Sequence, residues 1–358
     1  MDIMQKRTWA EIDLDAVAHN LEEIRGRIGG QTMVCCVIKA DAYGHGAVRL
    51  AREYEALGAD WLAVSNIEEA YCAALSENAV RRGVAVKIHI KVDTGMSRLG
   101  FYFQDADRDA AAVAEIAAAC RLPGLMPEGI FTHFAVADGG RAGEDFTAHQ
   151  LGCFSTLIEK LEREGITFPI RHCANSGATL DYPASHMDMV RAGVILYGLE
   201  PSADVLHPGD FHPVLSLRSV ISHIKAVEPG SDISYGRTYT AQSRIRVATI
   251  PIGYADGYSR QLSGRGSILV HGVRCPILGK VCMDQCMIDV TAVPQAQVGD
   301  VVTLIGRDGD EEIRVDALAD LLDTIHYEIV CGISKRVTRV YKKDGREDSV
   351  FDCILDQP

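Results

Sequence analysis

The sequence lacks the features that mark membrane, secreted and nucleic-acid-binding proteins. No apolar run approaches the roughly 18 residues needed to span a bilayer, and residues 1–6 lack the apolar stretch of a signal peptide. Positive charge is also scarce, because 36 lysines and arginines are outnumbered by 49 aspartates and glutamates, giving a net charge of −13. A negatively charged chain repels nucleic acid and anionic lipid. We therefore expect a cytoplasmic protein without membrane contact or a nucleic-acid partner.

A cysteine framework is absent as well. The 11 cysteines are an odd number and are scattered without regular spacing, which suits a reducing cytoplasm. Cys282 and Cys286 come closest to a metal-binding pattern, but no second pair of cysteine or histidine ligands completes it. The sequence therefore predicts no metal site.

The first half of the chain alternates strand-like and helix-like patterns. The 358 residues suffice for two domains with buried cores, and 47% apolar with 24% charged residues is ordinary for a globular protein. Alternation between residues 13 and 205 predicts a parallel β/α architecture, and the number of units favours a TIM-type barrel over an open sheet. Helices are expected over residues 13–30, 47–57, 106–121 and 144–163, and from residue 67 onward. Six strands are expected, ending near Lys39, Ser65, Val92, Phe134, Asn175 and Leu196.

The second half has a different pattern. From about residue 213, short β-branched runs such as 217–227 and 245–252 are separated by glycine- and proline-rich turns. This pattern predicts an all-β domain. The strand-like residues 9–12 are expected to pair with it, since chain termini often lie close together. The predicted division is residues 13–205 for the barrel, and residues 1–12 with 213–358 for the β domain.

Lys39 has the most direct chemical implication of any residue in the chain. It follows the apolar run that begins at residue 33, and it precedes a polar loop that contains Tyr43, Gly44 and Gly46. Burial at a strand end favours the neutral, nucleophilic form of an amine, which an aldehyde cofactor requires for a Schiff base. The ordinary alternative is a lysine whose side chain extends from a strand end to water.

Polar residues gather where the predicted strands end, which is where a β/α barrel places its reactive groups. Two glycine-containing loops, Asn175-Ser176-Gly177 and Arg191-Ala192-Gly193-Val194, follow the last two strands. Backbone N–H groups beside glycine, together with a hydroxyl, can bind an anion. Each loop alone is typical of an ordinary turn, but the pair favours a phosphate site. A reactive lysine and a phosphate site in one barrel indicate pyridoxal phosphate.

Several segments of the chain match one family of enzymes. They are VIKADAYGHG (37–46), KVDTGMSRLG (91–100), HCANS (172–176), MVRAG (189–193), ISYGRTY (233–239), IGYADG (252–257) and CMDQ (282–285). With these segments the chain resembles the alanine racemases, which use pyridoxal 5'-phosphate and combine an N-terminal barrel with a C-terminal β domain. The segments span nearly the whole chain in the order found in the family.

The resemblance implies two catalytic bases. Lys39 would bind the cofactor aldehyde and act as one base, and Tyr235 of the partner subunit in a homodimer would act as the other. Racemisation removes the α-proton of an amino acid from one face and returns a proton to the opposite face. A single base would tend to return the proton to the face that it left. Without the resemblance, Tyr235 would be interpreted as a half-buried tyrosine in a turn.

The resemblance also implies the cofactor and substrate contacts. Arg191 would face the pyridine nitrogen, and because a guanidinium keeps its proton, the ring would be a weaker electron sink, which discourages transamination. Lys91 matches a position that is carbamylated in some members and would then pair with Arg98. The implied cofactor-binding residues are Lys39, Tyr43, Arg98, His133, Asn175, Ser176, Arg191, Gly193, Val194 and Tyr327, and the implied substrate contacts are Arg98, Tyr254, Met283 and Asp284.

Tyr327 bears on substrate choice. It lies in the segment TIHYE (324–328), which resembles alanine-specific members, and a phenol there should accommodate a methyl group and crowd a hydroxymethyl group. We therefore expect interconversion of L-alanine and D-alanine, which supplies D-alanine as a peptidoglycan precursor. The alternatives are a serine or broad-specificity racemase of the same fold and a non-catalytic pyridoxal-phosphate-binding protein. Non-catalytic proteins of this kind usually consist of the barrel alone, so the β domain and Tyr235 argue against that alternative. A decarboxylase of the related fold is also less expected, because it needs no second base at this position.

One departure from the family concerns the barrel itself. Between Ser65 and Val86 the chain has room for one helix only, whereas the family has two further strands with their helices there. Strand number, tilt and stagger are linked in a barrel, so the same closed barrel cannot form. Either an internal segment is omitted from the sequence, which the intact motifs favour, or the deletion is genuine and the barrel is open or distorted. Omission predicts that the Cα atoms of Ala70 and Tyr71 lie farther apart than about 3.8 Å.

Overall fold

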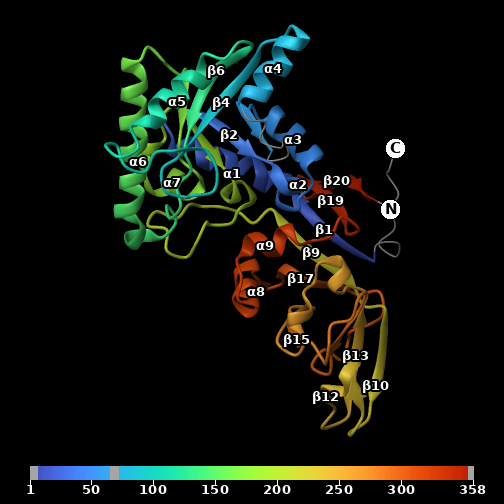
Figure 1. The fold of residues 1–358 in the computed structure, drawn as a ribbon. Coiled ribbons are helices and arrows are strands. Elements are labelled where there is room, and N and C mark those ends of the chain that lie inside the picture. Colours follow the sequence, from blue (N-terminus) through green and yellow to red (C-terminus); the bar gives the residue numbers. More distant parts are fainter. Residues whose placement is uncertain (1–6, 65–71, 354–358) are drawn as a thin grey trace. The chain divides into compact units, whose positions relative to one another are not determined.

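The computed structural model describes residues 7–64 and 72–353. They divide into two compact units, each built from segments that are distant in the sequence (Figure 1). Of the described residues, the barrel unit contains 18–39, 54–64 and 72–212, and the β unit contains 7–17, 40–53 and 213–353. No helix within the described residues is long and apolar enough to cross a membrane.

Parallel strands form the interior of the barrel unit. In the first sheet β2 pairs with β3 on one side and β8 on the other, and in the second β6 pairs with β4 and β7. Backbone bonds from Arg191 N to Ala174 O (3.0 Å) and from Asp188 N to Arg171 O (3.1 Å) place β7 beside β8. The bounds are β2 Met33–Val37, β3 Trp61–Ala63, β4 Val86–Asp93, β5 Phe101–Tyr102, β6 Leu125–Phe131, β7 Ile170–His172 and β8 Met189–Ala192.

The two sheets have the orders β3-β2-β8 and β7-β6-β4, and together they contain the six strands that the sequence predicts; the short β5 adds to β4. The pairings of the described residues do not join β3 to β4, which are the strands on either side of the shortened segment. Ala70 and Tyr71 lie outside the described residues. The prediction about their Cα distance therefore stays a prediction.

Helices cover the strands of the barrel unit on the outside, as α4, α5 and α6 show in Figure 1. Apolar side chains at helical spacing drive this packing: Val17, Leu21 and Ile24 of α1 are all buried. Cys35, Ile170 and Met189 form a buried cluster among the strands. The helix bounds in the first half of the chain are α1 Leu14–Arg27, α3 Ala47–Ala56, α4 Cys72–Arg82, α5 Ala111–Cys120, α6 Gly140–Arg163 and α7 Ser176–Asp181; most of α3 and the start of α1 belong to the β unit.

One predicted helix starts later than the sequence suggests. The pattern predicts a helix from residue 106, but α5 begins at Ala111. Asp109 Oδ2 accepts bonds from the backbone N–H groups of Gln104 and Asp105, both at 2.9 Å, and Asp105 Oδ1 accepts from Arg108 N at 2.9 Å. These side chains compete with helical hydrogen bonding and hold the segment as turns.

The β unit is built around an eight-stranded sheet in the order β15-β14-β17-β9-β1-β19-β20, with β18 paired to β17. As predicted, the N-terminal strand joins it: β1 lies antiparallel to β9 and parallel to β19. Two smaller sheets, β10-β13-β16 and β11-β12, complete the unit. The bounds are β1 Thr8–Asp13, β9 Leu215–Val220, β10 His223–Val227, β11 Asp232–Ile233, β12 Tyr239–Thr240, β13 Ile245–Ile250, β14 Ser267–Val270, β15 Val273–Pro276, β16 Cys286–Asp289, β17 Val301–Asp308, β18 Glu311–Ile313, β19 Thr338–Lys343 and β20 Arg346–Phe351.

The β unit differs from the predicted all-β pattern in two places. The predicted strand over 217–227 is two strands, because Ile221 N bonds to Asp300 O while Ser222 N bonds to Thr249 O, so that the chain changes sheets there. Two helices, α8 (Val315–Leu322) and α9 (His326–Cys331), follow β18. Val315, Leu318 and Ala319 are buried at helical spacing on α8, a periodicity that was available in the sequence.

Candidate active site

Lys39 lies two residues after Val37, the last residue of β2, at the carboxyl end of a strand that is paired on both sides. The backbone N–H of Ile38 bonds to Ala63 O at 2.8 Å, so β2 and β3 are held together up to the residue before Lys39. The lysine itself is half-buried. Its backbone position is therefore fixed by the sheet at the end where a β/α barrel carries its chemistry.

The segment after Lys39, α2 (Lys39–Tyr43), is a left-handed turn and not a right-handed helix. Four consecutive residues, Ala40, Asp41, Ala42 and Tyr43, have φ between 52° and 55°. Such a conformation costs about 1–2 kcal/mol for each residue that is not glycine. It persists only where the surroundings determine it.

Buried side chains of the β unit hold this left-handed turn. His45 Nδ1 donates to Tyr43 O at 2.8 Å, and burial lowers the pKa of His45 to about 4. Arg339 donates to Gly44 O from Nε at 3.2 Å and from Nη2 at 3.0 Å, and Tyr341 Oη donates to His45 O at 3.2 Å. The carbonyls of an otherwise strained segment are thus satisfied, and Tyr43 is held in one orientation.

Positive charge is concentrated around His133 in the barrel unit. Burial lowers the pKa of His133 to about 3, and the charges of Arg191, Arg98, Lys39 and Lys91, in that order, lower it further. Three of the predicted cofactor-binding residues, together with Lys91, therefore lie near enough to influence one imidazole that stays neutral. A site with this charge is suited to a phosphate and a carboxylate.

Arg191, on β8, lies at the centre of a hydrogen-bonded network. It donates from Nη1 to His172 Nδ1 at 3.0 Å and from Nη2 to His133 Nδ1 at 3.1 Å, and Nη2 also donates to Thr132 O at 2.9 Å. A guanidinium can only donate, so both imidazole Nδ1 atoms are acceptors and both rings carry their proton on Nε2. Burial, followed by the charge of Arg191, lowers the pKa of His172 to about 2. Arg191 thus has neutral imidazole partners, and burial lowers the pKa of its own guanidinium.

The network continues to two residues that the sequence analysis missed. His172 Nε2–H donates to His89 Nδ1 at 2.8 Å, so His89 also carries its proton on Nε2. That nitrogen lies 3.9 Å from Glu128 Oε2. Burial lowers the pKa of His89. His89 and Glu128 lie on β4 and β6, and their only sequence signal is a polar residue within an apolar strand.

The two glycine-containing loops after β7 and β8 meet. Gly193 N donates to Ser176 Oγ at 2.9 Å, which leaves the Ser176 hydroxyl proton to be donated elsewhere. Asn175 caps α7 by accepting from Ala178 N at 3.0 Å, which orients the start of that helix. Val194 starts a short 3-10 helix immediately after Gly193. Donors from both loops therefore converge, as an anion site requires.

Gly177 allows the start of α7 to lie close to the backbone of Ala137 and Asp138. A Cβ at this position would lie 2.9 Å from the backbone carbonyl of Ala137 and 2.9 Å from Asp138 N. These neighbours are backbone atoms, which cannot rotate away. Any side chain at residue 177 would therefore displace the start of α7 and Ser176 with it.

Lys91 and Arg98 lie on either side of a loop that Asp93 organises. Asp93 Oδ1 accepts from the backbone N–H groups of Gly95 at 3.0 Å and Ser97 at 2.9 Å. The half-buried Lys91 donates from Nζ to Leu99 O at 2.7 Å, and Arg98 is exposed. The buried carboxylate of Asp93 therefore holds the loop in its conformation.

Two of the predicted cofactor-binding residues, Tyr43 and Tyr327, meet within the β unit. The ring centroids of Tyr43 and Tyr327 lie 6.1 Å apart, and Tyr327 belongs to α9. Burial raises the pKa of Tyr43 to about 12, so its phenol remains a proton donor. A Cβ at Gly44 would lie 2.1 Å from Val330 O, which shows how closely this loop approaches α9.

The other predicted residues of the β unit, Tyr235, Tyr254, Met283 and Asp284, lie on neighbouring turns. Tyr235 is 70% exposed. It follows Ser234, whose Oγ donates to Lys280 O at 2.6 Å. The backbone N–H of Tyr254 donates to Cys282 O at 3.1 Å. The structure thus groups one large exposed phenol with a second tyrosine and a methionine at a surface of the β unit.

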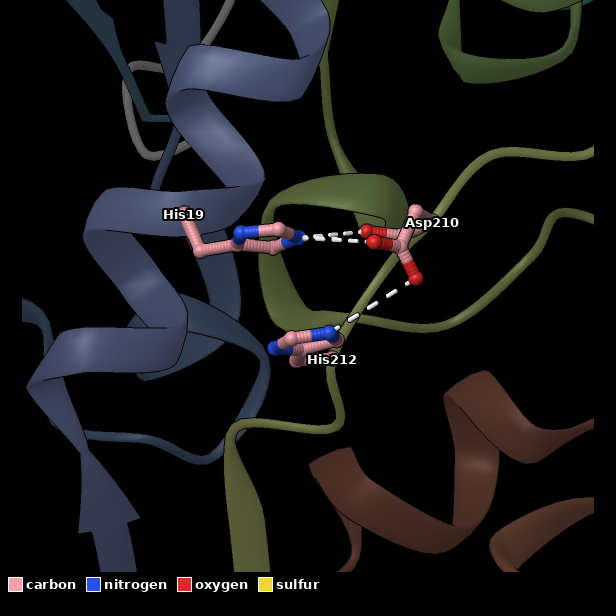
Figure 2. Close-up of side chains that lie close together, drawn as sticks. All are labelled: His19, Asp210 and His212. Atoms are coloured by element: carbon pink, nitrogen blue, oxygen red, sulfur yellow. Dashed lines mark hydrogen bonds and ion pairs between the residues drawn. The ribbon is translucent and has the colours of Figure 1, made fainter.

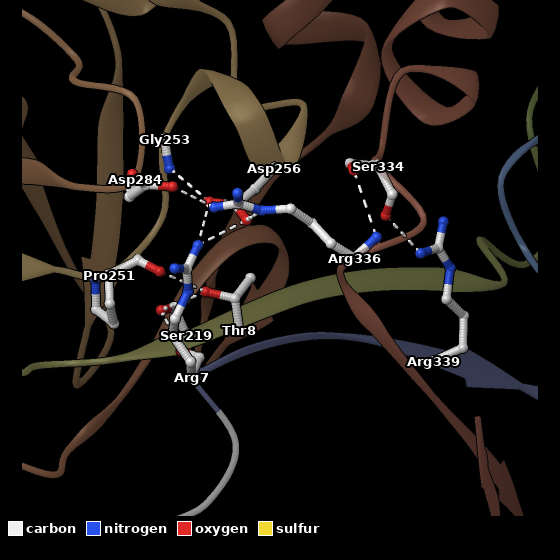
Figure 3. Close-up of polar contacts among 10 residues, drawn as sticks. All are labelled: Arg7, Thr8, Ser219, Pro251, Gly253, Asp256, Asp284, Ser334, Arg336 and Arg339. Atoms are coloured by element: carbon white, nitrogen blue, oxygen red, sulfur yellow. Dashed lines mark hydrogen bonds and ion pairs between the residues drawn. The ribbon is translucent and has the colours of Figure 1, made fainter. Parts of the chain in front are cut away.

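An ion-pair network fixes Asp284 and the turn that carries Tyr254 (Figure 3). Asp256, 3% exposed, accepts from Arg7 Nη2 and from Arg336 Nε, each at 2.7 Å. Arg336 Nη2 also donates to Asp284 Oδ1. Gly253 N donates to Asp256 Oδ2 at 2.9 Å. One buried carboxylate therefore orders the 253–257 turn and, through Arg336, orients Asp284.

Comparison with known proteins identifies the family to which this chain is similar. The family model "Alanine racemase, N-terminal domain" matches residues 12–74 and 70–201, and "Alanine racemase, C-terminal domain" matches residues 214–341. The two stretches of the N-terminal match meet at residues 70–74. That is the region in which the sequence analysis expects two strands of the family to be missing.

Individual relatives match nearly the whole chain. An alanine racemase from Desulfovibrio desulfuricans is 43% identical over 372 positions, which cover 93% of this chain and 97% of the relative. The alignment is longer than the 358-residue chain, so the relative contains residues without a counterpart here.

Solved structures agree with the fold. An alanine racemase from Clostridium difficile 630 matches with a TM-score of 0.91 and 35% identity, over 98% of this chain and 100% of that chain. An alanine racemase from Bacillus anthracis, solved with bound L-Ala-P, matches with a TM-score of 0.88 and 32% identity, over 98% of this chain and 99% of that chain.

Proposed function

We propose that this chain interconverts L-alanine and D-alanine with pyridoxal phosphate and two bases. The chain belongs to the alanine racemase family and is an amino-acid racemase. The observation that carries the proposal is the network of Arg191. A guanidinium held by two neutral imidazoles lies on the strand before the Ser176–Gly193 contact, in the unit that contains Lys39.

The residues of the barrel unit fit this cofactor. Ser176 Oγ–H, the start of α7 and Val194 supply donors for a phosphate. The phenols of Tyr43 and Tyr327, which belong to the β unit, are further proposed cofactor contacts. Lys39 supplies the amine to which the aldehyde attaches. When bound, pyridoxal phosphate withdraws electrons from the α-carbon of the substrate.

Arg191 would hold the pyridine nitrogen in its unprotonated form. Its hydrogen-bond partners His133 and His172 stay neutral because burial lowers their pKa values. None of these three groups can therefore deliver a proton to that nitrogen near neutral pH. Electron withdrawal is then limited, which favours prompt return of a proton to the substrate over transamination.

The two bases would act from opposite faces of the substrate. Lys39 Nζ takes or gives the α-proton on one face, and Tyr235 Oη of the partner subunit does so on the other. The exposure of Tyr235 in the β unit supports a role toward a second chain. Tyr254, Met283 and Asp284 lie on turns near Tyr235, and we assign them to the substrate entrance of the active site in the partner subunit. Arg336 orients Asp284 there.

A cation would hold the substrate carboxylate and the phenolic oxygen of the cofactor. Arg98 is the proposed donor, and a carbamate on Lys91 would convert a cation into an anion able to pair with it. The proposed biological setting is a cytoplasmic homodimer that supplies D-alanine as a peptidoglycan precursor.

Alanine is the proposed substrate because the phenol of Tyr327 would crowd a hydroxymethyl group. The test is to compare kcat/KM for L-alanine and L-serine with purified protein loaded with pyridoxal phosphate. We expect kcat/KM to be higher for L-alanine than for L-serine. In a Tyr327→Ala variant the ratio of these two kcat/KM values should be closer to one. Faster turnover of L-serine by the unmodified protein would contradict the assignment and favour a serine or broad-specificity racemase.

A further inference from the structure

Three potential ligands of a metal ion come together in the barrel unit, in a group that the proposed mechanism does not use. His19 of α1 lies beside Asp210 and His212 of the segment that follows the barrel strands (Figure 2). One ligand atom from each side chain lies within 4.8 Å of the others. His19 Nε2 lies 3.7 Å from Asp210 Oδ2, and His212 Nε2 lies 3.6 Å from Asp210 Oδ1.

The backbone that carries these ligands is held in place by a buried side chain. Asn20, fully buried and adjacent to His19, accepts from His212 N at 2.8 Å and donates from Nδ2 to His212 O at 2.9 Å. Arg27, two turns further along α1, donates to His207 O and Pro208 O, both at 2.9 Å. The segment with Asp210 and His212 is therefore fixed against the helix that carries His19, before any ligand binds.

The set of donors identifies the class of ion. Two imidazoles and one carboxylate suit borderline divalent transition ions such as Zn²⁺, whereas Ca²⁺ and Mg²⁺ prefer oxygen ligands alone. Three protein ligands would leave at least one coordination position for water. Because all three side chains reach the surface, an ion can enter without opening the fold.

Binding would require a specific local change. The rings of His19 and His212 are stacked, with centroids 3.9 Å apart and planes 9° from parallel, so their Nε2 lone pairs do not yet converge. His19 Nε2 also lies 2.7 Å from Asp210 O. Both rings must tilt and both Nε2 atoms must be unprotonated, because a protonated imidazole nitrogen cannot ligate a metal. Side-chain rotation achieves this, since the rings are partly exposed.

We propose that His19, Asp210 and His212 form a binding site for a divalent transition-metal ion of the Zn²⁺ class, separate from the proposed active site. The sequence analysis predicts no metal site, since it rests on local ligand spacing, whereas His19 is distant in the sequence from Asp210 and His212. The ion would join α1 to the segment around Asp210. It would therefore stabilise the barrel unit without taking part in racemisation.

The test is a calorimetric titration of ZnCl₂ into the cofactor-loaded protein, in a buffer that does not bind zinc. We expect one saturable site per chain, and His19→Gln and His212→Gln should each weaken binding by at least about tenfold. His223, an exposed histidine of β10, provides the matched control: His223→Gln should leave the affinity unchanged. Thermal unfolding without metal should show that all variants are folded.

Co²⁺ distinguishes this site from binding at cysteine, of which Cys331 is exposed. Co²⁺ bound by nitrogen and oxygen gives d–d absorption without the near-ultraviolet charge-transfer bands of a thiolate ligand. The proposal expects d–d absorption that disappears in His19→Gln and persists in His223→Gln. It is overturned if the native protein shows no saturable binding, or if affinity and spectrum are the same in both His19→Gln and His212→Gln.

Discussion

Arg191 donates a hydrogen bond from Nη1 to Nδ1 of His172 at 3.0 Å, and this bond fixes which nitrogen of the imidazole carries the proton. The consequence extends along the network, since His172 Nε2–H must then donate to His89. A single charged group on β8 thus sets the tautomers of imidazoles on β7 and β4.

Replacement of His172 tests this arrangement. His172→Leu removes the acceptor and leaves a buried donor of Arg191 without its partner, which should lower the free energy of unfolding by about 1–3 kcal/mol. His172→Asn places an amide oxygen close to the position of Nδ1 and should recover part of that loss. Urea unfolding of the cofactor-loaded proteins measures both. Equal stability of the two variants would contradict the role of the acceptor.

The histidine pKa values predict a loss of stability in acid. The pKa of His133 is lowered from 6.5 to about 3 and that of His172 from 6.5 to about 2. Between about pH 6.5 and pH 3 the unfolded chain therefore binds more protons than the folded one, so the free energy of unfolding falls as pH falls. Unfolding measured from pH 8 to pH 4 should show this slope.

A matched variant separates the histidines from the carboxylates, which also titrate at low pH. His172→Asn has one titrating group fewer, so its unfolding free energy should depend less steeply on pH below 6.5 than that of the native protein. Identical slopes would mean that burial does not keep His172 neutral.

Gly177→Ala tests the phosphate site. The added Cβ would lie 2.9 Å from backbone atoms of Ala137 and Asp138, so Ser176 must move. A displacement of this kind should weaken the binding of pyridoxal phosphate by roughly tenfold to a hundredfold. Gly152→Ala, within α6 and with no atom within 4 Å of the added Cβ, is the control and should bind normally. The measurement is cofactor titration followed by absorbance.

Tyr235→Phe tests the second base. In D₂O, the variant should still exchange the α-proton of one alanine enantiomer through Lys39, while racemisation falls by about 10²–10⁴-fold. Tyr239→Phe, in the paired strand β12, should leave both exchange and racemisation unchanged. Proton NMR of the α-position follows exchange, and optical rotation follows racemisation. Equal loss of exchange in both enantiomers, or an unaltered racemisation rate, would refute the assignment.

The sequence predicts the fold where pattern and local chemistry agree. The strand before Lys39 is visible as an apolar run, and α1 is visible as buried residues at helical spacing followed by glycine. The six strands and the pairing of β1 with the β unit follow from the same signals. The helix α8 shows a similar periodicity, but it lies between strands, and the β pattern on either side obscures it.

The remaining features depend on contacts that no local pattern contains. The left-handed turn from Ala40 to Tyr43 contradicts backbone preference and exists because Arg339, almost 300 residues later, binds Gly44 O. His89 joins the Arg191 network only because β4 lies two strands from β7, with β6 between them. Such residues are found from coordinates, since a lone histidine in a strand is ordinarily structural.

The chemistry of Lys39 is the central claim, and reduction with borohydride tests it most directly. We expect the purified protein to absorb near the wavelength of a pyridoxal Schiff base, to lose that absorption on borohydride treatment, and to carry the cofactor mass on the peptide that contains Lys39. Lys39→Ala should show neither the absorption nor the adduct. A reduced adduct on another lysine, or none with the cofactor present in excess, would contradict the account.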